Sequence, residues 1–192
     1  MAQDITSRKL NIGSGEFPKP GYVNVDYFSN TPPDVSHNLD QFPYPFEDNS
    51  FEVIEADHVL EHLQHVFDVM RELHRISAPG GMVRIRVPHF SRGFTHADHK
   101  RGFDVTFPYY FNPKFLPGYQ NFEFKLTKTR LTWFSQPYMK KSVMPHILVY
   151  TGMVLGAVIN FFANLSPWAC SRIWCFWVGG FEEVEFVFQT VK

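Results

Sequence analysis

Residues 10–15 read Leu10-Asn11-Ile12-Gly13-Ser14-Gly15, and this stretch decides the fold. Apolar residues that run directly into a Gly-Ser-Gly turn indicate a short buried strand ending in a turn lined by backbone. Glycines at such a turn let the main chain approach a ligand closely. The alternating, β-branched and aromatic residues of Tyr22 to Tyr27 predict a second strand that ends near Asp26.

The rest of the chain continues this pattern and predicts an α/β fold. Further strands are expected at residues 34–39, 51–56, 82–87, 122–134 and 184–191. Apolar residues at helical spacing over 59–76 predict two joined helices that end before Pro79-Gly80-Gly81. Together these elements predict a Rossmann-like, mostly parallel, seven-stranded sheet that binds its ligand at the carboxyl ends of the strands.

Length, charge and cysteine content narrow the class of protein. A chain of 192 residues is expected to form a single domain, 1–192, with a ligand-binding half at 10–88 and a second half at 89–192. The 18 Lys and Arg balance 19 Asp and Glu, so no nucleic-acid partner is expected. Cys170 and Cys175 match no disulfide framework or common zinc pattern, and Met1 to Lys9 holds no apolar run of a secretory signal. A cytoplasmic location is therefore expected, while the oligomeric state cannot be read from the sequence.

The glycine turn and Asp26 form a candidate nucleotide site. An acid at the end of the second strand can accept hydrogen bonds from two ribose hydroxyls, although the glycines could equally make a tight turn beside a solvated acid. A dinucleotide fingerprint requires a third glycine where Pro18 stands, and an acid about 20 residues further on. Asp26 follows Gly15 by eleven residues, which disfavours a dehydrogenase that uses NAD.

An ordered set of motifs resembles the class I S-adenosylmethionine-dependent methyltransferases, in particular their type 11 branch. The motifs are residues 10–15, 21–26, 38–40, 42–46, 48–52, 59–63 and 71–76, followed by Pro79-Gly80-Gly81. The resemblance covers Leu10 to Pro88 and implies S-adenosylmethionine as the cofactor. Glu61 and His62 are expected to organise the start of a helix.

The resemblance also implies a cofactor role for each of seven residues. Gly13 and Gly15 would approach the methionine moiety, Asp26 would hold the ribose, Asn38 and Leu39 would border the adenine, and Ala56 and Asp57 would contact the amino end of the methionine. Two features depart from the family pattern: Asn38 and Glu52 each stand where an Asp is usual. A third departure is the crossover from Gly15 to Tyr22, in which Pro18 and Pro20 leave no room for a helix.

Methyl transfer needs an aligned acceptor and, when the acceptor carries a proton, a base. The candidate bases are His58, His89, His96 and His99, the last two beside Asp98. The stretch from His89 to Arg101 could alternatively be a polar surface loop, and its Arg92, Lys100 and Arg101 could hold an anionic substrate or be a solvated face. His and Asp residues here could also ligate a metal, but no standard spacing is matched, so no metal site is predicted.

An aromatic-rich helical insertion is expected at about 142–180. Its stretch from Ser142 to Ser171 carries no charged residue besides His146, and Ile147 to Ala163 is apolar. One interpretation is a buried or capping helix. The other is a surface that rests on a membrane, with Trp168, Trp174 and Trp177 at the interface and Lys140 and Lys141 at its flank. A membrane-spanning helix is not expected, because later residues are needed to finish the sheet.

The sequence therefore predicts an S-adenosylmethionine-dependent methyltransferase whose insertion encloses the acceptor. The acceptor could be a small metabolite, a sugar or a lipid-linked compound, since the resemblance covers only the cofactor half. The alternative is a non-catalytic protein that keeps the same sheet as a scaffold, or as a membrane-associated partner.

Overall fold

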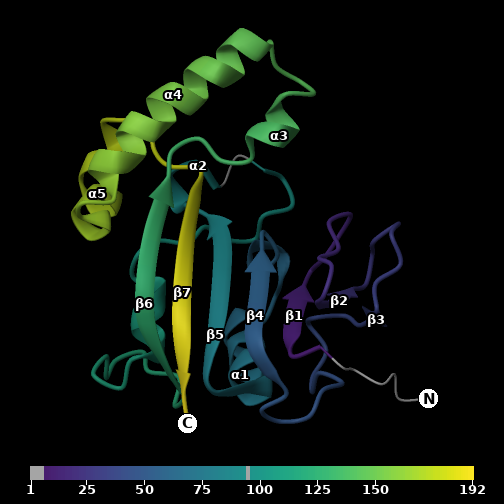
Figure 1. Cartoon of the computed structure of the whole chain (residues 1–192). Coiled ribbons are helices and arrows are strands. Elements are labelled where there is room, and N and C mark those ends of the chain that lie inside the picture. The colour runs from purple at the N-terminus through teal and green to yellow at the C-terminus, as the bar shows by residue number, and fades with distance from the viewer. Residues whose placement is uncertain (1–6, 94–95) are drawn as a thin grey trace.

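A computed structural model describes residues 7–93 and 96–192, so residues 1–6 of the N-terminal stretch and residues 94–95 of the histidine-rich stretch lie outside it. The strands are β1 (Lys9–Ile12), β2 (Val23–Asp26), β3 (Val35–Ser36), β4 (Phe51–Asp57), β5 (Ser77–Pro88), β6 (Glu123–Thr132) and β7 (Glu183–Val191). They form one seven-stranded sheet in the order β3-β2-β1-β4-β5-β7-β6 (Figure 1). The strands from β3 to β5 pair in parallel, and β7 runs antiparallel to both of its neighbours. The predicted mostly parallel sheet is confirmed.

Fewer helices pack on the sheet than in a doubly wound fold, in which helices cover both faces. The helices are η1 (Leu60–His62), α1 (Val66–Ile76), α2 (Phe90–Gly93), η2 (Phe107–Phe111), α3 (Pro137–Lys140), α4 (His146–Ala163), α5 (Pro167–Arg172) and η3 (Trp174–Phe176). The two joined helices predicted over 59–76 are η1 and α1. The carboxylate of Asp40 accepts hydrogen bonds from the backbone N–H groups of Gln64 and His65, which holds the start of α1.

The hydrophobic core lies on one face of the sheet only. Alternate residues of β5, Val83, Ile85 and Val87, are fully buried on the α1 side, because successive side chains of a strand point to opposite faces. Against β7 and β6 this core is aromatic, with ring centroids 5.1–5.9 Å apart among Phe107, Phe111, Phe124 and Phe188. These four phenylalanines, all of which come after Pro88 in the chain, fill the core.

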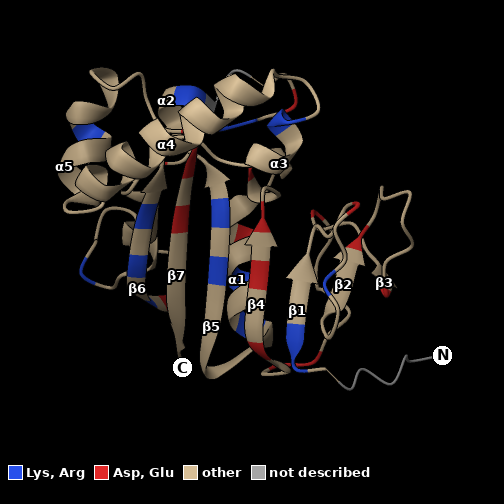
Figure 2. Ribbon diagram, turned by 45° about the horizontal axis from the view of Figure 1, so that its top comes forward, with Lys and Arg blue, Asp and Glu red and all other residues tan. Residues whose placement is uncertain are grey.

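The opposite face of the sheet is polar. Figure 1 shows α1 behind the sheet, and among residues 7–93 and 96–192 no helix covers the front. Figure 2 marks charged residues along β4, β5, β6 and β7, and Arg84 and Arg86 of β5 alternate with the buried residues of that strand, so they point to the front face. The cause is local: the β1–β2 crossover, with Pro18 and Pro20, is a loop where a parallel pair normally has a helix.

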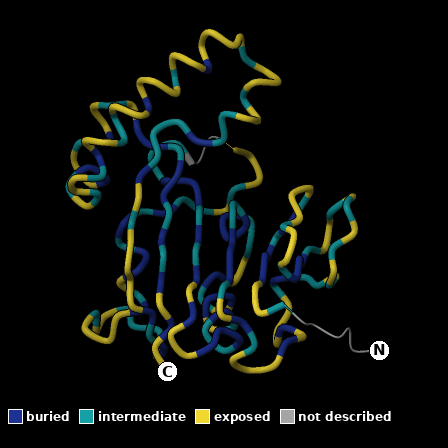
Figure 3. The backbone as a smooth tube through the Cα atoms, viewed as in Figure 1, coloured by how far each residue is buried: buried dark blue, intermediate teal, exposed yellow. Residues whose placement is uncertain are grey.

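Residues 133–182 form the insertion between β6 and β7. Helix α4 is the one described helix that is long and apolar enough to cross a membrane by length and composition, and 17% of it is buried. Only Val149, Gly156 and Ala163 of this helix are buried. Of the buried or capping helix expected at 147–163, the structure shows the capping form: α4 sits over the end of the sheet with most of its surface exposed (Figure 3).

Candidate functional site

A cavity of about 1010 Å³ lies where the parallel strands end. One wall is the turn from Gly13 to Phe17, and the floor is Asp57, the last residue of β4, with His58 after it. The opposite wall comes from the segment between Thr132 and Lys140, which leads into the insertion. A volume of this size is sufficient for a nucleoside cofactor and part of an acceptor. The cavity also sits where parallel α/β sheets bind their ligands.

The glycine turn has the backbone that its sequence requires. Gly13 has a φ of +62° and Gly15 a φ of +47°, both in the left-handed region that glycine adopts without strain. A Cβ added to Gly13 would lie 2.3 Å from Cγ2 of Val59, whereas a Cβ on Gly15 would meet no atom within 4 Å. Gly13 therefore allows close packing against the segment after β4, and Gly15 keeps the cavity wall open.

Asp26 is fixed at the end of β2 beside this turn. Its Oδ2 accepts a hydrogen bond of 2.8 Å from the backbone N–H of Gly15, and its Oδ1 accepts from the N–H groups of Tyr27 and Phe28. A carboxylate has about four acceptor positions, so capacity remains for ribose hydroxyls. Asp26 does not itself line the cavity but is held against the glycine turn that does, so its assignment to the ribose stays a prediction.

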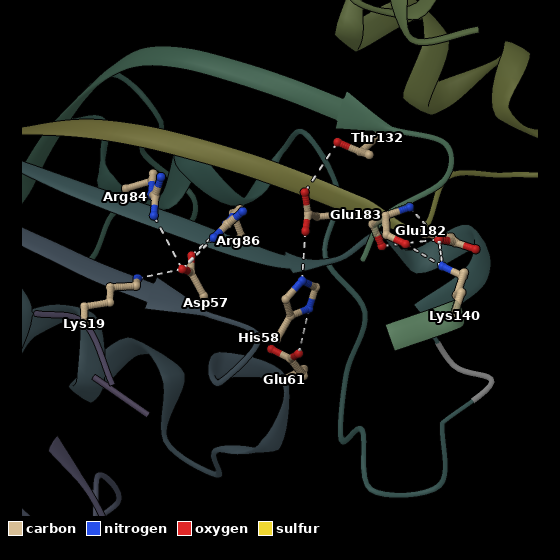
Figure 4. A network of polar contacts seen from close by, with 11 residues as sticks. Lys19, Asp57, His58, Glu61, Arg84, Arg86, Thr132, Lys140, Glu182 and Glu183 are labelled. Atoms are coloured by element: carbon tan, nitrogen blue, oxygen red, sulfur yellow. Dashed lines mark hydrogen bonds and ion pairs between the residues drawn. The ribbon is translucent and has the colours of Figure 1, made fainter. Parts of the chain in front are cut away.

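Asp57 is the most strongly paired residue of the cavity floor. It contacts Lys19 at 2.7 Å and Arg86 at 2.6 Å, and Arg84 at 3.4 Å (Figure 4). Burial alone would raise its pKa, but the hydrogen bonds from Arg86 and Lys19 outweigh burial and hold the pKa well below its usual range. Asp57 is therefore a permanent anion.

Lys19 belongs to the proline-containing crossover loop and occupies the sheet face that a helix would otherwise cover. Its ammonium also binds Glu55 at 2.6 Å, and Arg84 binds Glu55 at 2.8 Å. The carboxamide of Asn24 accepts from the backbone N–H of Lys19 and so ties the loop to β2. Ion pairs centred on Lys19 thus occupy the part of the sheet face that a crossover helix would normally cover.

The other residues that the resemblance assigned to the cofactor lie deeper or further away. Ala56 is fully buried, and Leu39 is in the core with its carbonyl accepting from the hydroxyl of Tyr44. Asn38 uses its side chain to accept from the backbone N–H of Asp40. None of the three lines the cavity as described, so the contacts to adenine and to the methionine amino end stay predictions.

The sequence was compared with models of known protein families and with curated proteins. Residues 7–85 match the model of a family described as "Methyltransferase domain", of type 11. This match indicates a methyltransferase domain over the cofactor-binding half of the chain. No curated protein matches the sequence at a significant level.

Solved structures show the same fold at low sequence identity. An S-adenosylmethionine-dependent methyltransferase from Archaeoglobus fulgidus is 14% identical with a TM-score of 0.57, covering 97% of this chain and 87% of that one. The YcgJ protein of Bacillus subtilis is 13% identical with a TM-score of 0.53, covering 98% and 93%. A putative methyltransferase in complex with the Haloferax volcanii activator Trm112 is 12% identical with a TM-score of 0.53, covering 100% and 86%.

His58 is the first candidate base of the methyltransferase, and its surroundings give it a charge. Its Nε2 lies 2.8 Å from Oε2 of Glu183 and its Nδ1 lies 3.5 Å from Oε1 of Glu61. Burial lowers the pKa of His58, but the two carboxylates outweigh burial and raise the pKa to about 9. At neutral pH the ring is an imidazolium, which can donate hydrogen bonds but cannot accept a proton.

The other candidate histidines of the methyltransferase fall into two groups. His89 is fully buried and its ring nitrogens bond the hydroxyls of Ser91 and Ser171; burial lowers its pKa to about 4. It is not among the residues that line the cavity. His96 and His99 do line it, with their rings stacked at 4.7 Å. Accessible bases therefore come from the second group.

Glu61, His62 and His99 together could hold a metal ion, because one ligand atom from each lies within 4.8 Å of the others. Both carboxylate oxygens of Glu61 are buried, and neither has a hydrogen-bond partner among the described residues. Spacing alone could not reveal this group, since Glu61 and His99 are far apart in the chain. Glu61 was expected only to organise the start of a helix, and it does lie in η1. Its carboxylate also forms an ion pair with His58 (Figure 4).

The contacts on the side of the cavity opposite the glycine turn were not predicted from the sequence. Phe17 and Tyr138 meet edge to face at 5.9 Å across the cavity mouth. Glu182 binds Lys140 at 2.6 Å and Arg92 at 2.8 Å, which ties α3 and α2 to the start of β7. No motif marks these residues, because only the antiparallel insertion of β7 between β5 and β6 brings them together.

Proposed function

We propose that the methyltransferase modifies a polar group carried on an amphipathic acceptor, such as a lipid-linked compound, in preference to a free small metabolite or sugar. The observation that carries this proposal is the composition of the cavity mouth. Phe17 and Tyr138 are 60% and 57% exposed there, and Met139 follows. His96 and His99 supply a polar wall within the same cavity. An apolar rim over a polar interior suits a ligand with both characters.

The reaction is a displacement in which the acceptor atom bonds to a methyl carbon as the carbon–sulfur bond breaks. S-adenosylmethionine supplies that methyl group, and a hydroxyl or amine acceptor also gives up a proton. The Gly13–Gly15 turn and Asp26 would hold the cofactor. His96 and His99 are placed to take the proton, whereas the charged His58 would orient the acceptor by donating a hydrogen bond.

Cofactor binding is tested by isothermal titration of the protein with S-adenosylhomocysteine. Replacing Asp26→Asn removes the charge while keeping the shape, and we expect about tenfold weaker binding, because hydrogen bonds to a charged acceptor are the stronger ones. The matched control is Asp68→Asn, an exposed acid on α1, whose affinity should equal that of the wild type. Equal affinity for both variants would remove Asp26 from the ribose site.

Acceptor class is tested by measuring S-adenosylhomocysteine release with two fractions of a cell extract, one soluble in organic solvent and one aqueous. The proposal expects turnover with the lipid fraction and loss of turnover in His96→Gln with His99→Gln. Cofactor affinity should be unchanged in this double variant. Turnover with the aqueous fraction alone would refute the amphipathic acceptor while leaving methyl transfer intact.

A second candidate function is a non-catalytic scaffold. The ion pairs of Asp57 favour this function. Lys19 and Arg86 both bind its carboxylate, which leaves less capacity for the amino end of a cofactor. The same titration separates the two functions. A folded protein with no affinity for S-adenosylhomocysteine would favour the scaffold.

A further inference from the structure

The insertion carries an exposed apolar surface that the cavity does not use. We call it the apolar ridge and define it as the exposed apolar residues from Ile147 to Trp177. On α4 the ridge includes Ile147, Val154, Val158 and Phe161, which are 71%, 67%, 54% and 66% exposed. Beyond α4 it continues through Trp168, Ile173, Phe176 and Trp177, the last 80% exposed. Exposed apolar surface on this scale marks an interaction site.

Only one narrow stripe of α4 contacts the protein. Val149, Gly156 and Ala163 are buried at helical spacing, and the side chain of Asn160 accepts from the backbone N–H of Trp133. A Cβ on Gly152 would lie 3.1 Å from the ring of Phe134, so this helix face packs closely. At 100° per residue, the exposed apolar positions cover most of the remaining circumference. The ridge is therefore convex and apolar on several sides.

The topology keeps α4 from spanning a bilayer. Thr132 at the end of β6 pairs with Glu183 at the start of β7, so the insertion leaves and re-enters the sheet at one edge. If α4 crossed a bilayer, residues 165–182 would have to cross back. That segment is made of the short α5 and η3 and includes Arg172, whereas a span needs about 20 apolar residues. A helix with this topology could contact a membrane only by lying along its surface.

Basic side chains stand beside the ridge. A groove of about 780 Å³ between α4 and β6 is lined by Lys128 and Arg130 on one side and by Met153 and Phe161 on the other. Lys128 pairs with Glu185 at 3.3 Å, while Arg130 is exposed and has no ion pair within the described ranges. Lys141 is also exposed, just ahead of α4. Apolar and cationic groups together match the acyl chains and phosphates of an anionic lipid.

We infer that the apolar ridge docks on anionic lipid bilayers, with α4 in the plane of the interface and Arg130 and Lys128 beside the headgroup phosphates. Trp168 and Trp177 lie at the end of the ridge, and tryptophan rings favour the headgroup level. A fluid bilayer can surround a convex helix on several sides, whereas the surface of a second copy would cover one side of it. The inference is independent of the proposed acceptor, because docking of the ridge requires neither the acceptor nor the cofactor.

Vesicle co-sedimentation of the full chain without cofactor tests the inference. The probes are vesicles of phosphatidylcholine alone and of phosphatidylcholine mixed with phosphatidylglycerol. We expect binding to the anionic vesicles, with salt weakening it, and a blue shift of tryptophan fluorescence. Val154→Asp with Val158→Asp should reduce partitioning by at least about tenfold, because both side chains lie on the outermost line of α4. Arg130→Gln should reduce it by about fivefold.

Matched controls distinguish docking from general stickiness. Phe28→Asp with Leu116→Asp replaces side chains that are 86% and 84% exposed away from the ridge, and vesicle binding should be unchanged. Each variant is also titrated with S-adenosylhomocysteine, so a folding failure is seen separately. Three results would overturn the inference: no vesicle binding by the wild type, vesicle binding by the Val154 and Val158 variant equal to that of the wild type, or a dimer in light scattering that this variant dissociates, which would assign the ridge to a second copy.

Discussion

Replacing Glu183→Gln should discharge His58 at neutral pH. The carboxylate of Glu183 lies 2.8 Å from the ring, and the side chain of His58 is 23% exposed. The rise in the pKa of His58 from 6.5 to about 9 corresponds to about 3 kcal/mol in favour of the charged ring in the folded state. Loss of one close opposite charge lowers such a pKa by about 1 to 3 units. At pH 7 the variant should lose about 2 kcal/mol of unfolding free energy.

The pH dependence of this loss has a definite sign. Because the folded-state pKa of His58 lies above its value of 6.5 in an unfolded chain, the stabilisation is complete below pH 6.5 and disappears as pH rises through about 9. Urea denaturation of wild type and variant should therefore differ most near pH 6 and converge at high pH. His89 has the opposite dependence, since its pKa is lowered to about 4, but it cancels in the difference between the two proteins.

Nuclear magnetic resonance titration of the histidine rings, with a chelator present, measures the pKa directly. The control is Glu185→Gln, two residues further along β7, whose carboxylate pairs with Lys128 at 3.3 Å. It should leave His58 titrating near 9. A wild-type His58 that titrates near 6.5, or equal effects of Glu183→Gln and Glu185→Gln, would refute the reasoning.

Two further predictions concern the glycine turn and the crossover loop. Gly13→Ala should destabilise the protein by about 2–4 kcal/mol in urea denaturation, because its Cβ would clash with Val59 and its φ is +62°; Gly15→Ala, with open space, should cost about 1 kcal/mol. Lys19→Met should cost about 1–3 kcal/mol, because it leaves partly buried acids short of a cation. Arg8→Met, which breaks an exposed ion pair, should cost under about 1 kcal/mol and serves as its control.

The sheet could be predicted from the sequence because its signals are local. Each strand combines β-branched residues with a glycine, proline or acid at its end, and helix α1 has an apolar stripe of Val66, Val69, Leu73 and Ile76. The strand expected at 82–87 in fact begins at Ser77, because residues 77–81 continue the pairing with β4 through a register shift. Pro79-Gly80-Gly81 was interpreted only as the end of a helix, whereas these residues lie within β5.

The site was predictable only where it is local. Gly13, Gly15 and Asp26 lie within one β-loop-β unit, and the structure brings them together. The partners of His58 could not be foreseen, because Glu183 is 125 residues away and reaches it through the antiparallel insertion of β7. The sequence left the exposure of α4 open for a different reason: an apolar helix in the core and one at an interface have the same composition, and only the surrounding structure separates them.

The protein has two uncovered surfaces, and their chemistry is opposite. On the open sheet face, polar groups satisfy one another: the carboxamide of Asn11 donates to Asn24, and Lys19 lies between Glu55 and Asp57. Water can solvate what remains, so this face requires no partner. Water cannot stabilise the apolar ridge in this way, because the free energy of side chains such as Val154 and Trp177 falls only when they leave water. An uncovered polar sheet is thus consistent with the protein on its own, and an uncovered apolar helix requires a non-aqueous surface to complete it.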